Sequence, residues 1–178
     1  MANTHSFINT TRCTCWDVDA YNACGIYTSG DLDNGVFVTR GAMQNTSGAI
    51  NDYAFTVSLP SANATNLWVI DTPEVGSALD VQIYDDPRYF YNPAGKPMSI
   101  RYLHPEVDFI EVDANAFASG SAPADQPTYK FASVNTSGRL VVANTAPQSG
   151  TYFAIAGTKS IDIGNEVVTT YVLQCVNN

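Results

Sequence analysis

The sequence predicts an all-β protein, a single-domain β-sandwich or small barrel with at most one short helix. Short apolar or alternating runs recur along the 178 residues, and Gly, Pro, Asn and Asp separate them. The turn signals come about every ten residues, a spacing typical of sandwiches and barrels. No window keeps the i, i+3, i+4, i+7 apolar repeat of an amphipathic helix. A chain of this length is the size of one domain.

The predicted strands are the runs richest in β-branched and aromatic residues, which fit a pleated, half-buried surface. These runs are 36–39, 53–57, 67–70, 81–84, 100–103, 107–112, 138–142, 151–156 and 167–176. The last run is the longest.

Two tight turns are predicted from Gly and Asn, which tolerate positive φ more readily than other residues. Asn34 and Gly35 directly precede an apolar strand, and Ala94 and Gly95 lie between two prolines. Both pairs are therefore predicted to be structural turns. Residues 135–138 form a third turn signal, and 163–166 is predicted to be the tip of a closing hairpin.

One short helical turn is predicted at 113–118, where Asp113 stands at the N-cap position before small residues. The Ser-, Ala- and Pro-rich stretch that follows is typical of an exposed loop. Residues 1–30 are rich in Thr and Asn and lack periodicity. They are predicted to be an extended N-terminal arm that orders on binding a partner, ahead of a β-rich globular domain at 31–178.

Composition excludes several classes of function. Charged residues make up 14% of the chain, and the net charge is −9 with only 8 Lys plus Arg. The negatively charged protein would repel the phosphate backbone of a nucleic acid, so no nucleic-acid partner is expected. No apolar run is long enough for a membrane span and no signal peptide is recognised, so no membrane partner is expected. Low charge with many tyrosines is compatible with a surface made for protein contacts.

Four cysteines, Cys13, Cys15, Cys24 and Cys175, are the candidate metal ligands, and three of them lie within twelve residues. The Cys-x-Cys spacing is tighter than the usual zinc knuckle, so no metal and no cofactor is expected. Reduced, partly buried thiols are the default in a chain without an export signal. Zinc binding and one or more disulfides stay open as alternatives.

No catalytic residues are predicted. His5 lies in the predicted arm, and His104 precedes a proline with no nucleophile elbow nearby. Asp108 and Glu111 have opposite strand parity and would face opposite sides of a sheet. Phosphate-binding loops, zinc-protease motifs and calcium loops are missing from the sequence. We therefore expect a protein that is not an enzyme.

The densest aromatic segment is the predicted partner-binding site. It contains Tyr84, Arg88, Tyr89, Phe90 and Tyr91. Tyrosine and arginine are typical anchors of protein interfaces. A sugar-stacking platform and core packing around a turn are the two alternative interpretations of the same residues.

Three segments carry a resemblance to a known family: 30–38, with its Leu-x-Asn-Gly-Val element, 89–97, with Asn-x-Ala-Gly-Lys, and 100–103, which reads Ile-Arg-Tyr-Leu. They resemble small proteins encoded beside the major capsid protein in tailed phages of Gram-positive hosts. The resemblance implies a β-rich head decoration (cement) protein that binds the outer capsid lattice and has no catalytic activity. It also implies a homo-oligomer, which we expect to be a trimer, on the virion surface after assembly in the bacterial cytoplasm.

The main alternative function is a carbohydrate- or receptor-binding β-module of a phage fibre, tail or adhesin. The same strand pattern and the aromatic segment would suit it. A hydrolase using the acidic residues is a third possibility and would require a pocket of convergent carboxylates.

Overall fold

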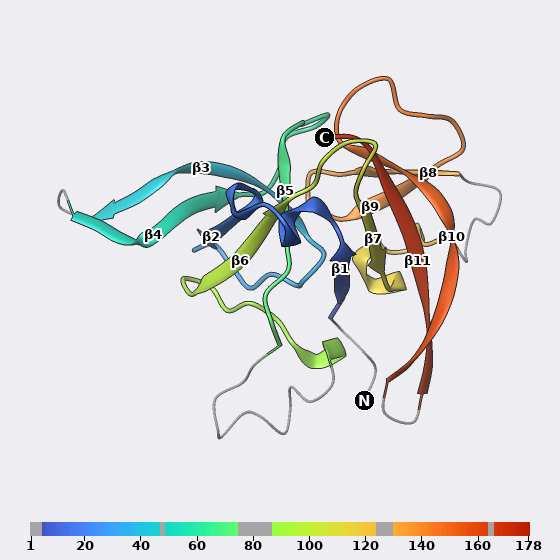
Figure 1. The fold of residues 1–178 in the computed structure, drawn as a ribbon, viewed down its shortest axis with the longest axis horizontal. Helices are drawn as coiled ribbons and strands as arrows, with labels where there is room; N and C mark the ends of the chain where they lie inside the picture. Colours follow the sequence, from blue (N-terminus) through green and yellow to red (C-terminus); the bar gives the residue numbers. More distant parts are fainter. Residues whose placement is uncertain (1–4, 47–48, 75–86, 124–129, 164–165) are drawn as a thin grey trace.

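The chain forms an all-β fold with two sheets in a computed structural model (Figure 1), which confirms the predicted class. The structure describes residues 5–46, 49–74, 87–123, 130–163 and 166–178. Its strands are β1 Ile8–Arg12, β2 Asn22–Ile26, β3 Phe37–Thr46, β4 Ala49–Ser58, β5 Leu67–Ile70, β6 Pro97–Tyr102, β7 Phe109–Val112, β8 Phe131–Val134, β9 Leu140–Ala143, β10 Tyr152–Ile163 and β11 Glu166–Asn177. Short 3₁₀ turns lie at η1 Thr14–Trp16, η2 Asp19–Tyr21, η3 Pro87–Tyr89 and η4 Ala114–Ala116.

The strands divide between an open sheet and a closed barrel. The open sheet has six strands in the order β1-β7-β11-β10-β8-β9, and all its pairings are antiparallel. The barrel runs β2-β4-β3-β5-β6 and closes through the antiparallel pair of β2 and β6, with β2 and β4 parallel. The sequence left sandwich and barrel open, and the fold combines a barrel with a sheet.

Strand β5 shows why some strands are apolar on both faces. All four of its residues are buried. Successive side chains of a strand point to opposite faces. Leu67 and Val69 belong to the core between barrel and sheet, whereas Trp68 and Ile70 belong to the core inside the barrel. A strand buried on both faces therefore reads as a continuous apolar run.

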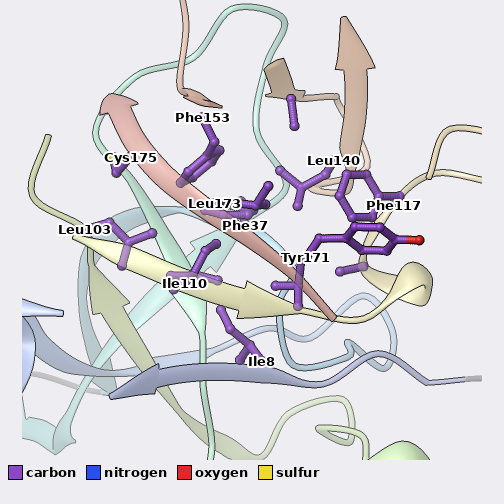
Figure 2. Packing of buried hydrophobic residues seen from close by; sticks show 14 of the residues in the cluster. Ile8, Phe37, Leu103, Ile110, Phe117, Leu140, Phe153, Tyr171, Leu173 and Cys175 are labelled. Atoms are coloured by element: carbon purple, nitrogen blue, oxygen red, sulfur yellow. The ribbon is translucent and has the colours of Figure 1, made fainter. Parts of the chain in front are cut away.

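The core between the two sheets is the larger of the two, and Figure 2 shows its central side chains. Phe37 of β3 and Phe153 of β10 meet there, with ring centroids 5.3 Å apart. The Phe37 backbone N–H also donates to the carbonyl of Gly138 at 2.8 Å. Gly138 has φ +74°, and a Cβ there would lie 2.3 Å from the Phe37 carbonyl oxygen, so only glycine fits this close approach.

Residues 5–30 differ from the predicted arm, because they supply one strand to the open sheet and one to the barrel. Strand β1 is an edge of the open sheet, with Ile8 opposite Val112 of β7, and β2 lies between β4 and β6 in the barrel. Phe7, Ile8, Cys13 and Cys15 are buried. Burial of these apolar side chains and strand pairing hold the segment, so the expected boundary at residue 30 does not divide the described chain. Ordering on partner binding stays a prediction.

The predicted C-terminal hairpin and the predicted helical turn are both present in the structure, although Asp113 does not cap the turn. The hairpin predicted near the C-terminus is confirmed by pairing of Ile163 with Glu166, and its tip at 164–165 lies outside the described residues, as does the predicted strand 81–84. The predicted helical turn appears as η4. Asp113 stands before it without capping it, and accepts a hydrogen bond from the Phe7 N–H at 3.3 Å instead.

Candidate partner-binding site

The two predicted turns lie side by side in the structure. Leu32 and Asn92 form an antiparallel bridge, with N–H to carbonyl distances of 3.0 and 2.7 Å. The Asn92 side chain also donates to the Leu32 carbonyl and to the Asn34 amide oxygen, both at 3.1 Å. The segments 30–38 and 89–97 therefore form one structural unit.

Each turn uses glycine at positive φ, +83° at Gly35 and +74° at Gly95. The Ala94 N–H donates to the Asp31 carboxylate at 2.9 Å. Asn34 acts through its side chain, because its φ is not positive. Its amide accepts from the Thr72 N–H at 3.1 Å and donates to the Thr72 carbonyl at 2.9 Å. These four predicted turn residues have a structural role.

The described part of the aromatic segment predicted to bind a partner is largely buried in the fold. Arg88 and Phe90 are buried, and Tyr89 and Tyr91 are half-buried. The Arg88 guanidinium forms an ion pair with Glu166, and Tyr91 stacks on His5 with ring centroids 5.2 Å apart. Tyr84 lies outside the described residues. Burial of Arg88 and Phe90 supports the core-packing interpretation for them, since a buried side chain offers no contact surface.

No disulfide joins the four cysteines. Cys13, Cys15 and Cys175 are buried in the core between barrel and sheet, and Cys24 is half-buried in β2. Within the described parts of the chain, no group of three or more His, Cys, Asp or Glu side chains is placed to hold a metal ion. The absence of a bound metal stays an expectation.

The buried thiols have shifted pKa values. Burial, with the Asp108 carboxylate adding to it, raises the pKa of Cys175 to about 12. The hydrogen-bonding interaction between the Cys13 and Cys15 side chains raises the pKa of Cys13, and burial adds to the rise. The same hydrogen bond lowers the pKa of Cys15 against the opposing effect of burial, and Arg101 adds to the lowering. Because all three side chains are buried, solvent reagents have little access to them.

The predicted carboxylates are engaged in structural contacts. Asp108 accepts hydrogen bonds from the backbone N–H groups of His104 at 2.6 Å and Thr14 at 2.7 Å, and from the Thr14 hydroxyl at 3.1 Å. Glu111 pairs with the Lys159 ammonium. These carboxylates fix a loop and a strand pair, and Asp108 also lines the cavity beside Trp16.

One hairpin extends away from the rest of the molecule, to the left in Figure 1. Strand β3 pairs with β5 only at Phe37–Thr39, and β4 pairs with β2 only at 54–56. We call residues 41–46 and 49–53 the β3–β4 ribbon. Within the described residues, its two strands pair only with each other.

The β3–β4 ribbon exposes large side chains and carries little charge. Met43 is 39% exposed and Tyr53 is 73% exposed. Asp52 is the single charged residue of positions 41–53 in the sequence. Tyr53 has φ +51°, an uncommon value for a bulky residue. At the ribbon's base, the Arg40 guanidinium lies 4.3 Å from the Trp68 ring centroid and anchors β3 to the barrel.

A second long hairpin, β10–β11, has a different surface. We call residues 157–163 and 166–170 the β10–β11 ribbon. Three charged residues, Lys159, Asp162 and Glu166, occupy positions 157–170. Lys159 pairs with Glu111 of β7, and Glu166 pairs with Arg88 of η3. Val167 is 71% exposed.

Trp16 is 57% exposed in η1 and is not among the site residues predicted from the sequence. It lies beside a cavity of about 320 Å³ that Val107 also lines. A tryptophan in a Thr- and Cys-rich segment was the available signal, and the expectation of an N-terminal arm concealed it.

Comparison with known proteins returned no match among protein-family models, curated proteins or solved structures. Among the described residues, no helix has the length and apolar character needed to cross a membrane.

Proposed function

We propose that this protein is a structural virion protein that binds the outer surface of a tailed-phage capsid lattice and decorates or stabilises it. The first support is the resemblance of segments 30–38, 89–97 and 100–103 to head decoration proteins. The first two segments are joined at the Leu32–Asn92 bridge, so they form one unit of the fold. The proposed partner is the major capsid protein, and the proposed location is the virion surface.

The observation that carries the proposal is the β3–β4 ribbon. The centres of protein interfaces are poor in charge and rich in Tyr and Met. The ribbon has this character, because Met43 and Tyr53 are exposed and Asp52 is its only charged residue. Its outer edges have no strand partner within the described residues, so a strand of the capsid protein has free backbone groups to pair with.

We further propose that the protein acts as a homo-oligomer, with a trimer as the favoured state. A closed oligomer would present several copies of the ribbon to the lattice at once, which raises the effective affinity of each contact. Light scattering coupled to gel filtration would measure the mass. A trimer has three times the 19.2 kDa mass of the chain.

Co-sedimentation with capsid shells that lack the protein tests the proposed function. We expect saturable binding at a fixed ratio to the major capsid protein. Since the ribbon carries little charge, binding should change little with salt concentration. Failure to co-sediment at every salt concentration would overturn the proposal.

A further inference from the structure

A separate surface feature lies at η1, away from the β3–β4 ribbon in sequence. Trp16 and Val107 are 57% and 51% exposed, and both line the cavity of about 320 Å³. Thr11, Arg12 and Asp17 also line it. An exposed indole beside hydrogen-bonding side chains in a concave site is a combination typical of small-ligand pockets.

The indole of Trp16 is held in place by a closed set of contacts. Its Nε1 donates to the Thr10 hydroxyl at 3.2 Å, and that hydroxyl donates to the Asp71 carboxylate. The Arg101 guanidinium pairs with Asp71 at 2.6 Å and lies 4.3 Å from the Trp16 ring centroid. A ring fixed before binding loses little conformational entropy when a ligand stacks on it.

Polar side chains surround the fixed ring. Thr11, Arg12 and Asp17 are exposed, and their side-chain polar groups have no hydrogen-bond or ion-pair partner within the described residues. Together they offer a hydroxyl that donates and accepts, a guanidinium that donates and a carboxylate that accepts. Asp108 also lines the cavity, so one guanidinium and two carboxylates face it, which disfavours an anionic ligand, and a ligand with hydroxyl groups can both donate to and accept from these side chains.

From this geometry we propose that the Trp16 pocket binds a neutral pyranose saccharide. The apolar face of the sugar ring would stack on the indole, and its hydroxyls would bond to Thr11, Arg12 and Asp17. The net charge of −9 disfavours anionic saccharides. This binding site is independent of the proposed capsid contact.

A second cavity on the molecule lacks these features. It lies around η4 and Arg139, and its aromatic side chain, Phe117, is buried. A sugar ring there would find no exposed aromatic face. The Trp16 pocket is therefore the better saccharide site of the two.

Isothermal titration calorimetry on the isolated protein tests the proposal with cellotetraose and N-acetylchitotetraose, and with sialyllactose as the anionic comparison. At least one neutral tetrasaccharide should bind, and more tightly than sialyllactose. Trp16→Ala should weaken that binding at least tenfold. Asp17→Asn should weaken it about tenfold, the effect of losing one charge-assisted hydrogen bond. Tyr53→Ala, which changes an exposed aromatic residue of the ribbon, is the matched control and should bind normally.

Tryptophan fluorescence gives a second readout. Because Trp68 is buried inside the barrel, a change on adding sugar should come from Trp16. The Trp16→Phe variant keeps an aromatic face but lacks the indole. It should show no fluorescence change on adding sugar, and calorimetry should still detect binding that is weaker than that of the wild type.

Binding of no saccharide by the wild-type protein, or equal binding by Trp16→Ala, would overturn the saccharide site, and so would preferential binding of sialyllactose. These measurements contain no capsid shells. Their failure would leave the capsid proposal standing, and failure of co-sedimentation would leave the saccharide site standing.

Discussion

The two long hairpins of this protein start from a common core and end in different surfaces. At the base of the two hairpins, Phe37 of β3 packs against Phe153 of β10. Beyond this contact, the β3–β4 ribbon extends away from the body with exposed Met43 and Tyr53. The β10–β11 ribbon is instead linked to β7 and η3 by the ion pairs of Lys159 and Glu166.

We propose that this difference separates a contact element from a supporting element. Ion pairs with the body satisfy two charged groups of the β10–β11 ribbon, and charged residues also protect exposed strands from unwanted pairing. The β3–β4 ribbon has a single charged residue in its sequence, Asp52, against three at positions 157–170. A ribbon with apolar side chains and free edges is an aggregation hazard unless a partner covers it. We therefore assign the partner contact to β3–β4.

The largest expected effect on stability comes from changing the Phe37–Phe153 contact, from which both ribbons extend. Phe153→Ala removes a fully buried ring from the core between the sheets. Loss of its burial and the remaining cavity should lower the free energy of unfolding by about 3–5 kcal/mol. Urea denaturation would measure this. Val167→Ala on the exposed surface is the control, with an expected change within about 0.5 kcal/mol. Similar losses of unfolding free energy for Phe153→Ala and Val167→Ala would contradict the placement of Phe153 in the core between the sheets.

A pH change should act on the stability of the molecule through Asp113, which lies just before η4. Burial raises the pKa of Asp113 from 3.8 to about 6, so the folded state holds this proton more tightly than the unfolded state. The contribution of Asp113 to the free energy of unfolding should therefore fall by about 3 kcal/mol as pH rises from below 4 to above 6.

Asp113→Asn tests this, because the amide stays neutral and can still accept from the Phe7 N–H. The variant should gain stability over the wild type as pH rises from 4 to 7.5, as measured by urea denaturation at each pH. A constant difference across that range would contradict the shifted pKa.

The turn that leads into β3 should be sensitive to side-chain shape. Gly35 has φ +83°, and the Asn34 amide holds the Thr72 backbone. Asn34→Val with Gly35→Val should lower the free energy of unfolding by about 1–3 kcal/mol, since a β-branched residue is strained at positive φ. Gly30→Ala, at a glycine with ordinary φ and open space, is the control for thermal unfolding. An unchanged melting temperature of the double variant would refute the turn.

The smallest expected effect is on the ion pairs of the β10–β11 ribbon. Lys159→Met removes the partner of Glu111 at a half-exposed site, so the loss should stay below about 1 kcal/mol. Hydrogen exchange should become faster in residues 157–163 and stay unchanged in the β3–β4 ribbon. If hydrogen exchange in the Lys159→Met variant became equally faster in both ribbons, the ion pair would not distinguish the β10–β11 ribbon from the β3–β4 ribbon.

The sequence could predict elements whose signal is local. Leu67–Ile70 was predicted with its observed bounds, because a run of large apolar residues marks a strand buried on both faces. The turns at Gly35 and Gly95 were predicted because glycine is needed at positive φ. In contrast, β1, β2 and β8 were not predicted. Strand β2 contains Asn, Ala, Cys and Gly, and it is stabilised by pairing with β4 and β6.

The candidate sites could be predicted less well, because exposure depends on contacts between distant segments. The composition of the aromatic segment predicts a binding site, yet Arg88 and Phe90 are buried against the fold. The sequence pattern places Trp16 in an arm, yet Arg101 and Thr10 fix its ring beside a cavity. The register that places Met43 and Tyr53 outside also includes strand irregularities near Met43, which composition does not specify.

Binding of ribbon variants to capsid shells tests the central claim most directly. Met43→Ser with Tyr53→Ser changes the contact ribbon, and Val167→Ser is the matched change on the supporting ribbon. All three residues are exposed, so each variant should remain folded. Co-sedimentation should weaken at least tenfold for the double variant and stay near the wild-type level for Val167→Ser. Equal binding by both variants, or a greater loss for Val167→Ser, would contradict the assignment of the partner contact to the β3–β4 ribbon.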